Sequence, residues 1–321
     1  MLTRPSMTSI GDSLIVHLVP ICWVGPFALV FSSILGLLWQ ETRLWAITAL
    51  CLYAAMRFTS DNFDLLSDSI QESLRTYFHS ALIAYFPMDY LTPSVVIAAE
   101  QWKRPQVILS GPHGVYALGC IRTLLATPPK HKNLAAVVAP IMAHTWSHAM
   151  FRMTGLDGMI PLSHTAIQRE MRRNAHRDLV VIPGGFIETN TGNEHFSTMA
   201  DVTWDYWLLQ CLRHGYDVSF QWIHGATQIY HTGKGGMRIR LMMAKLGLPC
   251  LVPGNVLARN EVPLSVCSFR LPVHHVPGAT RNSPEFHALV GEFRTRVGSL
   301  LTLYPHNLSK GQAPVVMASS L

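Results

Sequence analysis

Charged residues are scarce in this chain of 321 residues. Only 14% of its residues are Asp, Glu, Lys or Arg, and 49% are hydrophobic, whereas a soluble domain usually carries about 25% charged residues. The shortage of charge argues against a typical soluble protein and favours a membrane-associated one. The length is sufficient for one large or two small domains with a substantial core.

Several patterns that mark other classes of protein are absent. The net charge of +6 is compatible with binding to nucleic acid, to anionic lipid or to a phosphorylated substrate. However, no Lys/Arg-rich run with interleaved aromatic residues occurs, so we expect no nucleic-acid partner. The six cysteines form no C-x-x-C pair, which predicts buried free thiols in a reducing compartment. His144 and His148 have the spacing of helical zinc ligands but lack a clear third ligand, so we expect no metal.

The amino-terminal part is strongly apolar. From Ser13 to Trp39 the chain contains no Asp, Glu, Lys or Arg, and about 20 such residues can cross the hydrocarbon core of a bilayer. A second apolar stretch, Leu44–Met56, is short for a crossing. We therefore expect an uncleaved N-terminal membrane hairpin in residues 1–60, either two crossings or a re-entrant pair. A buried pair of soluble helices is the alternative.

Downstream, short β-like runs alternate with helical patterns. This alternation predicts an α/β domain over residues 61–308, with a mixed, largely parallel sheet flanked by helices, and a flexible tail over 309–321. The region 61–104 has an amphipathic helical pattern. The predicted strands are 107–110, 134–140, 179–183 and 217–223. The other predicted helices are 167–176, 201–214 and one that follows Ser283.

The last helix has a clear start and a clear apolar face. Ser283 is followed by Pro284, which supplies an N-cap residue and then a proline at the first helical position. The apolar positions recur at helical spacing, so we interpret them as core. They are Phe286, Leu289, Val290, Phe293, Val297 and Leu300.

The first candidate for chemistry follows the strand at 107–110. There Gly111, Pro112, His113 and Gly114 form a turn, and open α/β sheets hold their ligands at the carboxyl ends of strands. The glycines let a substrate approach the backbone, and an imidazole that titrates near neutral pH suits a general base. A histidine with only a turn-forming role is the alternative.

A second turn of similar form follows the strand at 179–183. Gly184 and Gly185 end it, and Glu188 comes shortly afterwards. The carboxylate could orient an imidazole or bind a polar group of a substrate, although a solvated loop residue would look the same. If the two strands are parallel neighbours, both turns lie at one edge of the sheet.

These turns belong to a longer ordered series of motifs. The segments are Tyr85-Phe86-Pro87, Gly111-Pro112-His113-Gly114, Leu118-Gly119, Gly184-Gly185 with Glu188, Cys211-Leu212-Arg213-His214-Gly215, His224-Gly225 and Leu251-Val252-Pro253. In this order, and over about residues 14–300, the chain resembles the diacylglycerol acyltransferase-2 family, which also contains monoacylglycerol acyltransferases and wax synthases. It departs from the family pattern at Gly111, where the family has a histidine, and at 204–207 and 267–272.

The resemblance implies a glycerolipid-acyltransferase-like fold and an acyl-CoA-dependent O-acyltransferase that makes neutral lipid in the endoplasmic reticulum membrane or at lipid droplets. Diacylglycerol is the first expected acceptor, with monoacylglycerol or a fatty alcohol as alternatives. His113 would be the general base, and Glu188 would orient it or bind the acceptor. The implied substrate-binding residues are Gly111, Pro112, Gly114, Gly184, Gly185, Arg213 and His214. Acyl-CoA is a co-substrate, no other cofactor is expected, and a homo-oligomer is left open.

Two other readings remain. One is a lysophospholipid acyltransferase, which would need a stronger anion site, and the other is an inactive lipid-binding scaffold. The arginines of 168–177 share one helical face. That face could contact coenzyme A phosphates or anionic headgroups, or could simply be solvated.

Overall fold

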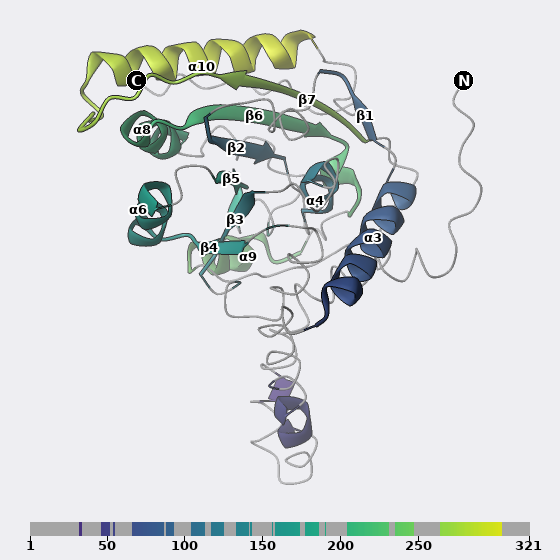
Figure 1. Cartoon of the computed structure of the whole chain (residues 1–321). Coiled ribbons are helices and arrows are strands. Elements are labelled where there is room, and N and C mark those ends of the chain that lie inside the picture. Colours follow the sequence, from purple (N-terminus) through teal and green to yellow (C-terminus); the bar gives the residue numbers. More distant parts are fainter. Residues whose placement is uncertain are drawn as a thin grey trace, which may run out of the picture.

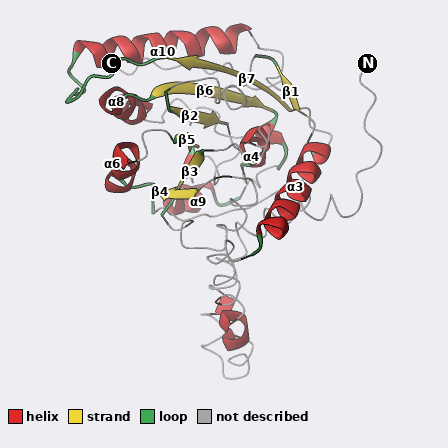
Figure 2. Ribbon diagram, viewed as in Figure 1, coloured by secondary structure: helices red, strands yellow, loops and turns green. Residues whose placement is uncertain are grey.

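In a computed structural model, the chain forms a seven-stranded mixed sheet with helices on both faces (Figures 1 and 2). The α/β class predicted from the sequence is therefore confirmed. The structure describes residues 32–33, 46–51, 54, 66–86, 88–92, 104–112, 117–124, 133–140, 142, 156, 158–173, 177–185, 190, 204–230, 235–246 and 264–303.

The strand order is β1-β7-β6-β2-β5-β3-β4. The β6–β7 pair is antiparallel and the other neighbouring pairs are parallel, so β1 and β7 run opposite to the other five strands. The bounds are β1 (Met88–Tyr90), β2 (Gln106–Gly111), β3 (Leu134–Val138), β4 (Gly158–Pro161), β5 (Asp178–Val181), β6 (Asp217–His224) and β7 (Leu264–Leu271).

The helices form two layers. α6, α8 and α10 contact one another in series on one face of the sheet, and α4 packs beside the short helix η7 on the other (Figure 1). The bounds are α3 (Asp68–Tyr85), α4 (Leu118–Leu124), α6 (His164–Arg173), α8 (Trp204–His214), η7 (Ala226–Gln228), α9 (Met237–Lys245) and α10 (Pro284–Leu303).

The central strands are buried on both faces. All six residues of β2 and all eight of β6 are buried, which explains why their sequences are mostly apolar without a strict alternation. Their few polar side chains therefore need partners inside the protein.

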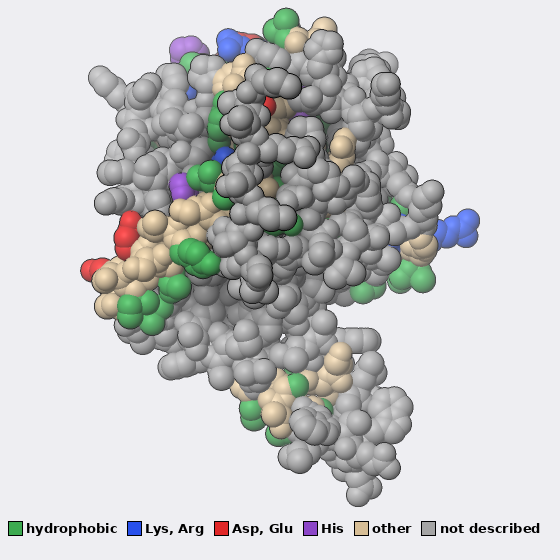
Figure 3. Space-filling model, turned by 90° about the vertical axis from the view of Figure 1, so that its right-hand side faces the viewer, with side chains coloured by type: hydrophobic (Ala, Val, Ile, Leu, Met, Phe, Trp, Pro, Cys, Tyr) green, Lys and Arg blue, Asp and Glu red, His purple; other side chains and the backbone are tan. Residues whose placement is uncertain are grey.

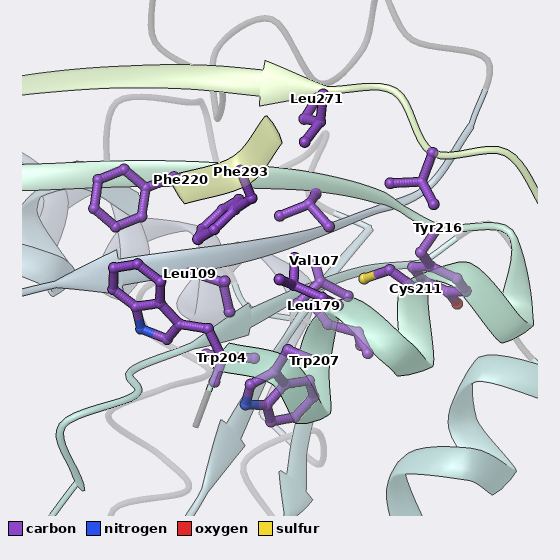
Figure 4. Packing of buried hydrophobic residues seen from close by; sticks show 14 of the residues in the cluster. Val107, Leu109, Leu179, Trp204, Trp207, Cys211, Tyr216, Phe220, Leu271 and Phe293 are labelled. Atoms are coloured by element: carbon purple, nitrogen blue, oxygen red, sulfur yellow. The ribbon is translucent and has the colours of Figure 1, made fainter. Parts of the chain in front are cut away.

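An aromatic core fills the space between the sheet and the helices α8 and α10 (Figure 4). The ring centroid of Trp204 lies 5.1 Å from that of Phe293 and 5.7 Å from that of Phe220. The apolar face predicted for α10 is confirmed as core, because all its members are buried except the half-buried Val290. The predicted start at Pro284 is also confirmed: the backbone N–H groups of Phe286 and His287 donate to the Ser283 carbonyl oxygen, and the Ser283 hydroxyl donates to the Thr280 carbonyl oxygen.

A charged cluster ties β7 to the amino ends of the parallel strands. Arg270 Nη2 lies 2.7 Å from Asp217 Oδ2, and both side chains are buried. The backbone N–H of Val273 donates to the other carboxylate oxygen at 3.0 Å. Nearby, Gln106 donates twice to Asp178, and burial raises the pKa of Asp178 while these hydrogen bonds oppose the rise. The charged side chains at the amino edge of the sheet are therefore paired with partners inside the protein.

Two sequence predictions concern the amino-terminal third of the chain: the helical region 61–104 and the membrane hairpin 1–60. The helical region predicted over 61–104 is wrong at the described residues after Tyr85, because α3 ends there and β1 (Met88–Tyr90) follows, whereas residues 93–103 lie outside the described residues. Phe86 leaves the helical conformation with φ −118° and ψ 81°, as expected for a residue that precedes a proline. The membrane hairpin predicted for 1–60 lies almost wholly outside the described residues. Along the described part of the chain, none of the helices combines the length and apolarity needed to cross a bilayer.

Candidate functional site

The candidate site lies at the carboxyl edge of the five parallel strands. β2 is the middle strand of the seven-stranded sheet, and it pairs with β5 on one side and β6 on the other. Leu109 is in register with Val181, and Gly111 with Trp222. The turns that follow the three strands are thus brought to one edge, as predicted for Gly111, Pro112, Gly184 and Gly185.

The predicted catalytic residues belong to short segments outside the described residues. This applies to His113 and Glu188, and also to Gly114, a predicted substrate-binding residue; their roles stay predictions. The structure does describe what flanks the first segment: Pro112 and Ala117 are both buried. Ala117 has φ 54°, a left-handed conformation that costs an L-residue roughly 1–2 kcal/mol.

A buried polar network joins β2, β6 and α4 directly beneath this turn. Gln221 Nε2 donates to Ser110 Oγ at 2.6 Å and to Thr123 Oγ1 at 2.7 Å. The Thr123 hydroxyl in turn donates to the Cys120 carbonyl oxygen at 2.7 Å. Each of the three polar side chains is almost completely buried. The network therefore fixes α4, which follows the turn, to the two strands that precede and flank it.

Close packing between α4 and η7 also fixes the position of α4. A Cβ atom added to Gly119 would lie 2.8 Å from Ala226 Cβ and 3.1 Å from Ile223 Cγ2. Only glycine permits this approach, so the Leu-Gly motif at 118–119 has a structural reason. Together the network and the contact hold α4 from two sides.

The Tyr-Phe-Pro motif reaches the same edge from α3. Tyr85 and Phe86 are buried, and the Phe86 carbonyl oxygen accepts a hydrogen bond of 2.8 Å from Arg122 Nε of α4. Burial raises the pKa of Tyr90 in β1, and the neighbouring Arg122 guanidinium opposes that rise. The Tyr-Phe-Pro motif and the Leu-Gly motif, which are more than 30 residues apart in the sequence, therefore meet at α4.

A histidine and a cysteine lie at the end of β6 and the start of β7. His224 Nε2 is 3.7 Å from Cys267 Sγ, and both residues are buried. Burial lowers the pKa of His224 to about 4 and raises the pKa of Cys267 to about 12. A catalytic thiolate–imidazolium pair needs the opposite shifts, so burial here favours the neutral forms of both side chains.

Arg213 and His214 are not brought to this edge. They end α8, which leads into the amino end of β6, next to the charged cluster around Asp217. Arg213 Nε donates to the Ala279 carbonyl oxygen at 2.6 Å, and burial, followed by the positive charge of Arg172, lowers the pKa of His214. Their predicted substrate contacts would therefore require a site separate from the one at Gly111.

Sequence reasoning missed the residues that support the site. Ser110, Thr123 and Gln221 carried no motif, and only the register of β2 with β6 reveals that they meet. Within the part of the chain that the structure describes, no three His, Cys, Asp or Glu side chains are grouped so that they could hold a metal ion. No protein-family model matches the chain, and a search of curated proteins found no relative.

Proposed function

We propose that the protein is an O-acyltransferase that moves a fatty acyl group from acyl-CoA to a hydroxyl group of a neutral lipid, most readily diacylglycerol. The proposal also assigns the chain to the diacylglycerol acyltransferase-2 family and to the endoplasmic reticulum membrane. Monoacylglycerol and fatty alcohols are the alternative acceptors, and the apolar amino-terminal stretch would supply a membrane anchor.

One observation carries the proposal: both ends of the segment 113–116 are held. Its first end follows the buried Pro112, the residue after the central strand β2. Its second end leads into α4, which the Gln221 network and the Gly119 contact fix. A base works well only when its supporting elements are rigid.

The reaction needs one proton to be moved. His113 would take the proton of the acceptor hydroxyl as its oxygen attacks the thioester carbonyl carbon. The carbon–sulfur bond then breaks, the acyl group stays on the acceptor as an ester, and the proton passes from His113 to the thiolate of coenzyme A. Glu188 would keep the imidazole oriented. No acyl-enzyme is required.

The test is acyl transfer in microsomes from host cells that lack their own neutral-lipid acyltransferases. Labelled acyl-CoA is offered with one acceptor at a time, and His113→Ala is compared with His287→Ala, an exposed histidine on α10. We expect neutral lipid from the wild type and the His287 variant, and none from His113→Ala. Product with a lysophospholipid only would favour the phospholipid branch, and no product with any acceptor, despite normal expression, would favour an inactive scaffold.

A further inference from the structure

The short helix α9 has the reverse of the usual polarity. On the side that faces the protein, Arg240 is only 1% exposed and Ala244 is buried. On the outer side, Ile239, Met242 and Leu246 are 59%, 54% and 65% exposed. A surface helix of a water-soluble protein normally turns its charged residues outward and its apolar residues inward.

The three outer side chains form one patch. Positions three and four residues apart share a face of a helix, so Ile239, Met242 and Leu246 stand in one row. Single exposed apolar side chains are common and need no explanation, but three in one row on so short a helix mark a contact surface.

The basic residues beside this row indicate which kind of surface the row contacts. Arg238 and Lys245 are exposed on α9, and the sequence contains no Asp or Glu from Val218 to Asn260. An apolar row next to basic side chains is the pattern of a helix that lies in the interface of an anionic membrane. A second copy of the same face would place like charges together, which disfavours self-association.

A second apolar patch lies on another helix, α3. The amino-terminal half of α3 exposes Ile70, Leu74 and Tyr77, which also share one helical face, and hydrophobic side chains gather along that helix in Figure 3. In Figure 1, α9 lies at mid-height beside β4, the amino-terminal half of α3 lies slightly lower, and the helical residues 46–51 lie well below both. Tyrosine is a residue enriched at membrane–water interfaces.

We propose that α9, together with the amino-terminal half of α3, docks on a bilayer that contains anionic phospholipid. The apolar row of α9 enters the boundary between headgroups and acyl chains, and Arg238 and Lys245 meet the lipid phosphates. This contact does not depend on the proposed reaction, and its test measures lipid contact rather than turnover.

The test uses the full chain with an environment-sensitive dye on a single introduced cysteine. Met242→Cys is compared with Leu303→Cys, where Leu303 is 71% exposed at the end of α10, in a background that carries Cys22→Ser, Cys51→Ser and Cys250→Ser. The buried Cys120, Cys211 and Cys267 are retained. Vesicles consist of phosphatidylcholine alone or with phosphatidylserine, and they contain brominated lipid as a quencher inside the bilayer.

We expect the dye at 242 to shift to the blue and to be quenched by the brominated lipid when phosphatidylserine is present, while the dye at 303 is unchanged. Arg238→Gln and Lys245→Gln should each weaken the contact about fivefold. Equal quenching of both dyes by aqueous iodide, with no effect of brominated lipid, would overturn the proposal. A blue shift without lipid that grows with protein concentration would also overturn it, in favour of a second copy.

Discussion

Replacing Gly119 by alanine tests whether the position of α4 controls the proposed site. The added Cβ would lie 2.8 Å from Ala226 Cβ, whereas carbon atoms in contact are normally about 3.5–4.0 Å apart. Neither atom belongs to a flexible side chain, so α4 must move by about 1 Å. The overpacking costs about 1–3 kcal/mol, and the better helix propensity of alanine returns up to about 1 kcal/mol.

The expected stability loss is therefore modest, from near zero to about 3 kcal/mol, whereas the expected rate loss is large. A displacement of about 1 Å in a catalytic arrangement can lower the rate about 100-fold. Acyl transfer in microsomes measures the rate, and thermal unfolding of the purified protein measures the stability. Gly119→Ala should thus separate the two quantities.

Two further variants make this experiment decisive. Gly291→Ala on α10 adds a methyl group where no other atom lies within 4 Å, so it should leave both quantities unchanged or raise stability slightly. Ala226→Gly removes the clashing atom and should restore much of the activity lost in Gly119→Ala. If Gly119→Ala keeps the wild-type rate while its melting temperature falls, the idea that α4 positions the base is incorrect.

Three other predictions concern buried polar groups. Gln221→Leu leaves the oxygens of Ser110 and Thr123 without their donor and should cost about 2–3 kcal/mol, seen as a drop of roughly 5–10 °C in melting temperature. Among the described residues no group pairs with the Arg240 guanidinium, so Arg240→Met should stabilise the protein by about 1–3 kcal/mol in denaturant unfolding; a loss would reveal a partner. His224 has a folded pKa of about 4, below its unfolded value of 6.5, so its contribution to stability is full above pH 6.5 and is lost as the pH falls through 4. The free energy of unfolding of His224→Gln should therefore change less between pH 6.5 and pH 4 than that of the wild type, by on the order of 3 kcal/mol.

The parts of the fold that follow from local pattern were predictable. The central strands are long buried runs, and α10 carries an apolar face at helical spacing, so both were predicted from the sequence. β4 was missed because it has only four residues, begins with Gly158 and ends with Pro161. β1 is equally short, and its strand character depends on pairing with β7, which lies more than 170 residues away in the chain.

The candidate site was predictable where one rule sufficed. Parallel strands place their carboxyl ends at one edge, which brought Gly111 and Gly184 together as expected. The same rule separates Arg213 from them, because a helix that leads directly into a parallel strand must end at the opposite edge. The resemblance grouped these residues by motif order alone, and motif order contains no information about the edge of the sheet. Whether His113 and Glu188 carry the chemistry stays a prediction.

The two segments that depart from the family pattern, 204–207 and 267–272, both contribute rings to the aromatic core. Trp204 belongs to one segment and Phe269 to the other, yet the rings of both lie 5.7 Å from the ring of Phe220 and less than 6 Å from that of Phe293. A large ring could not enter one segment without a matching adjustment in the other. The two segments therefore belong to one packed cluster, and we expect related sequences to vary at positions 204 and 269 together rather than independently.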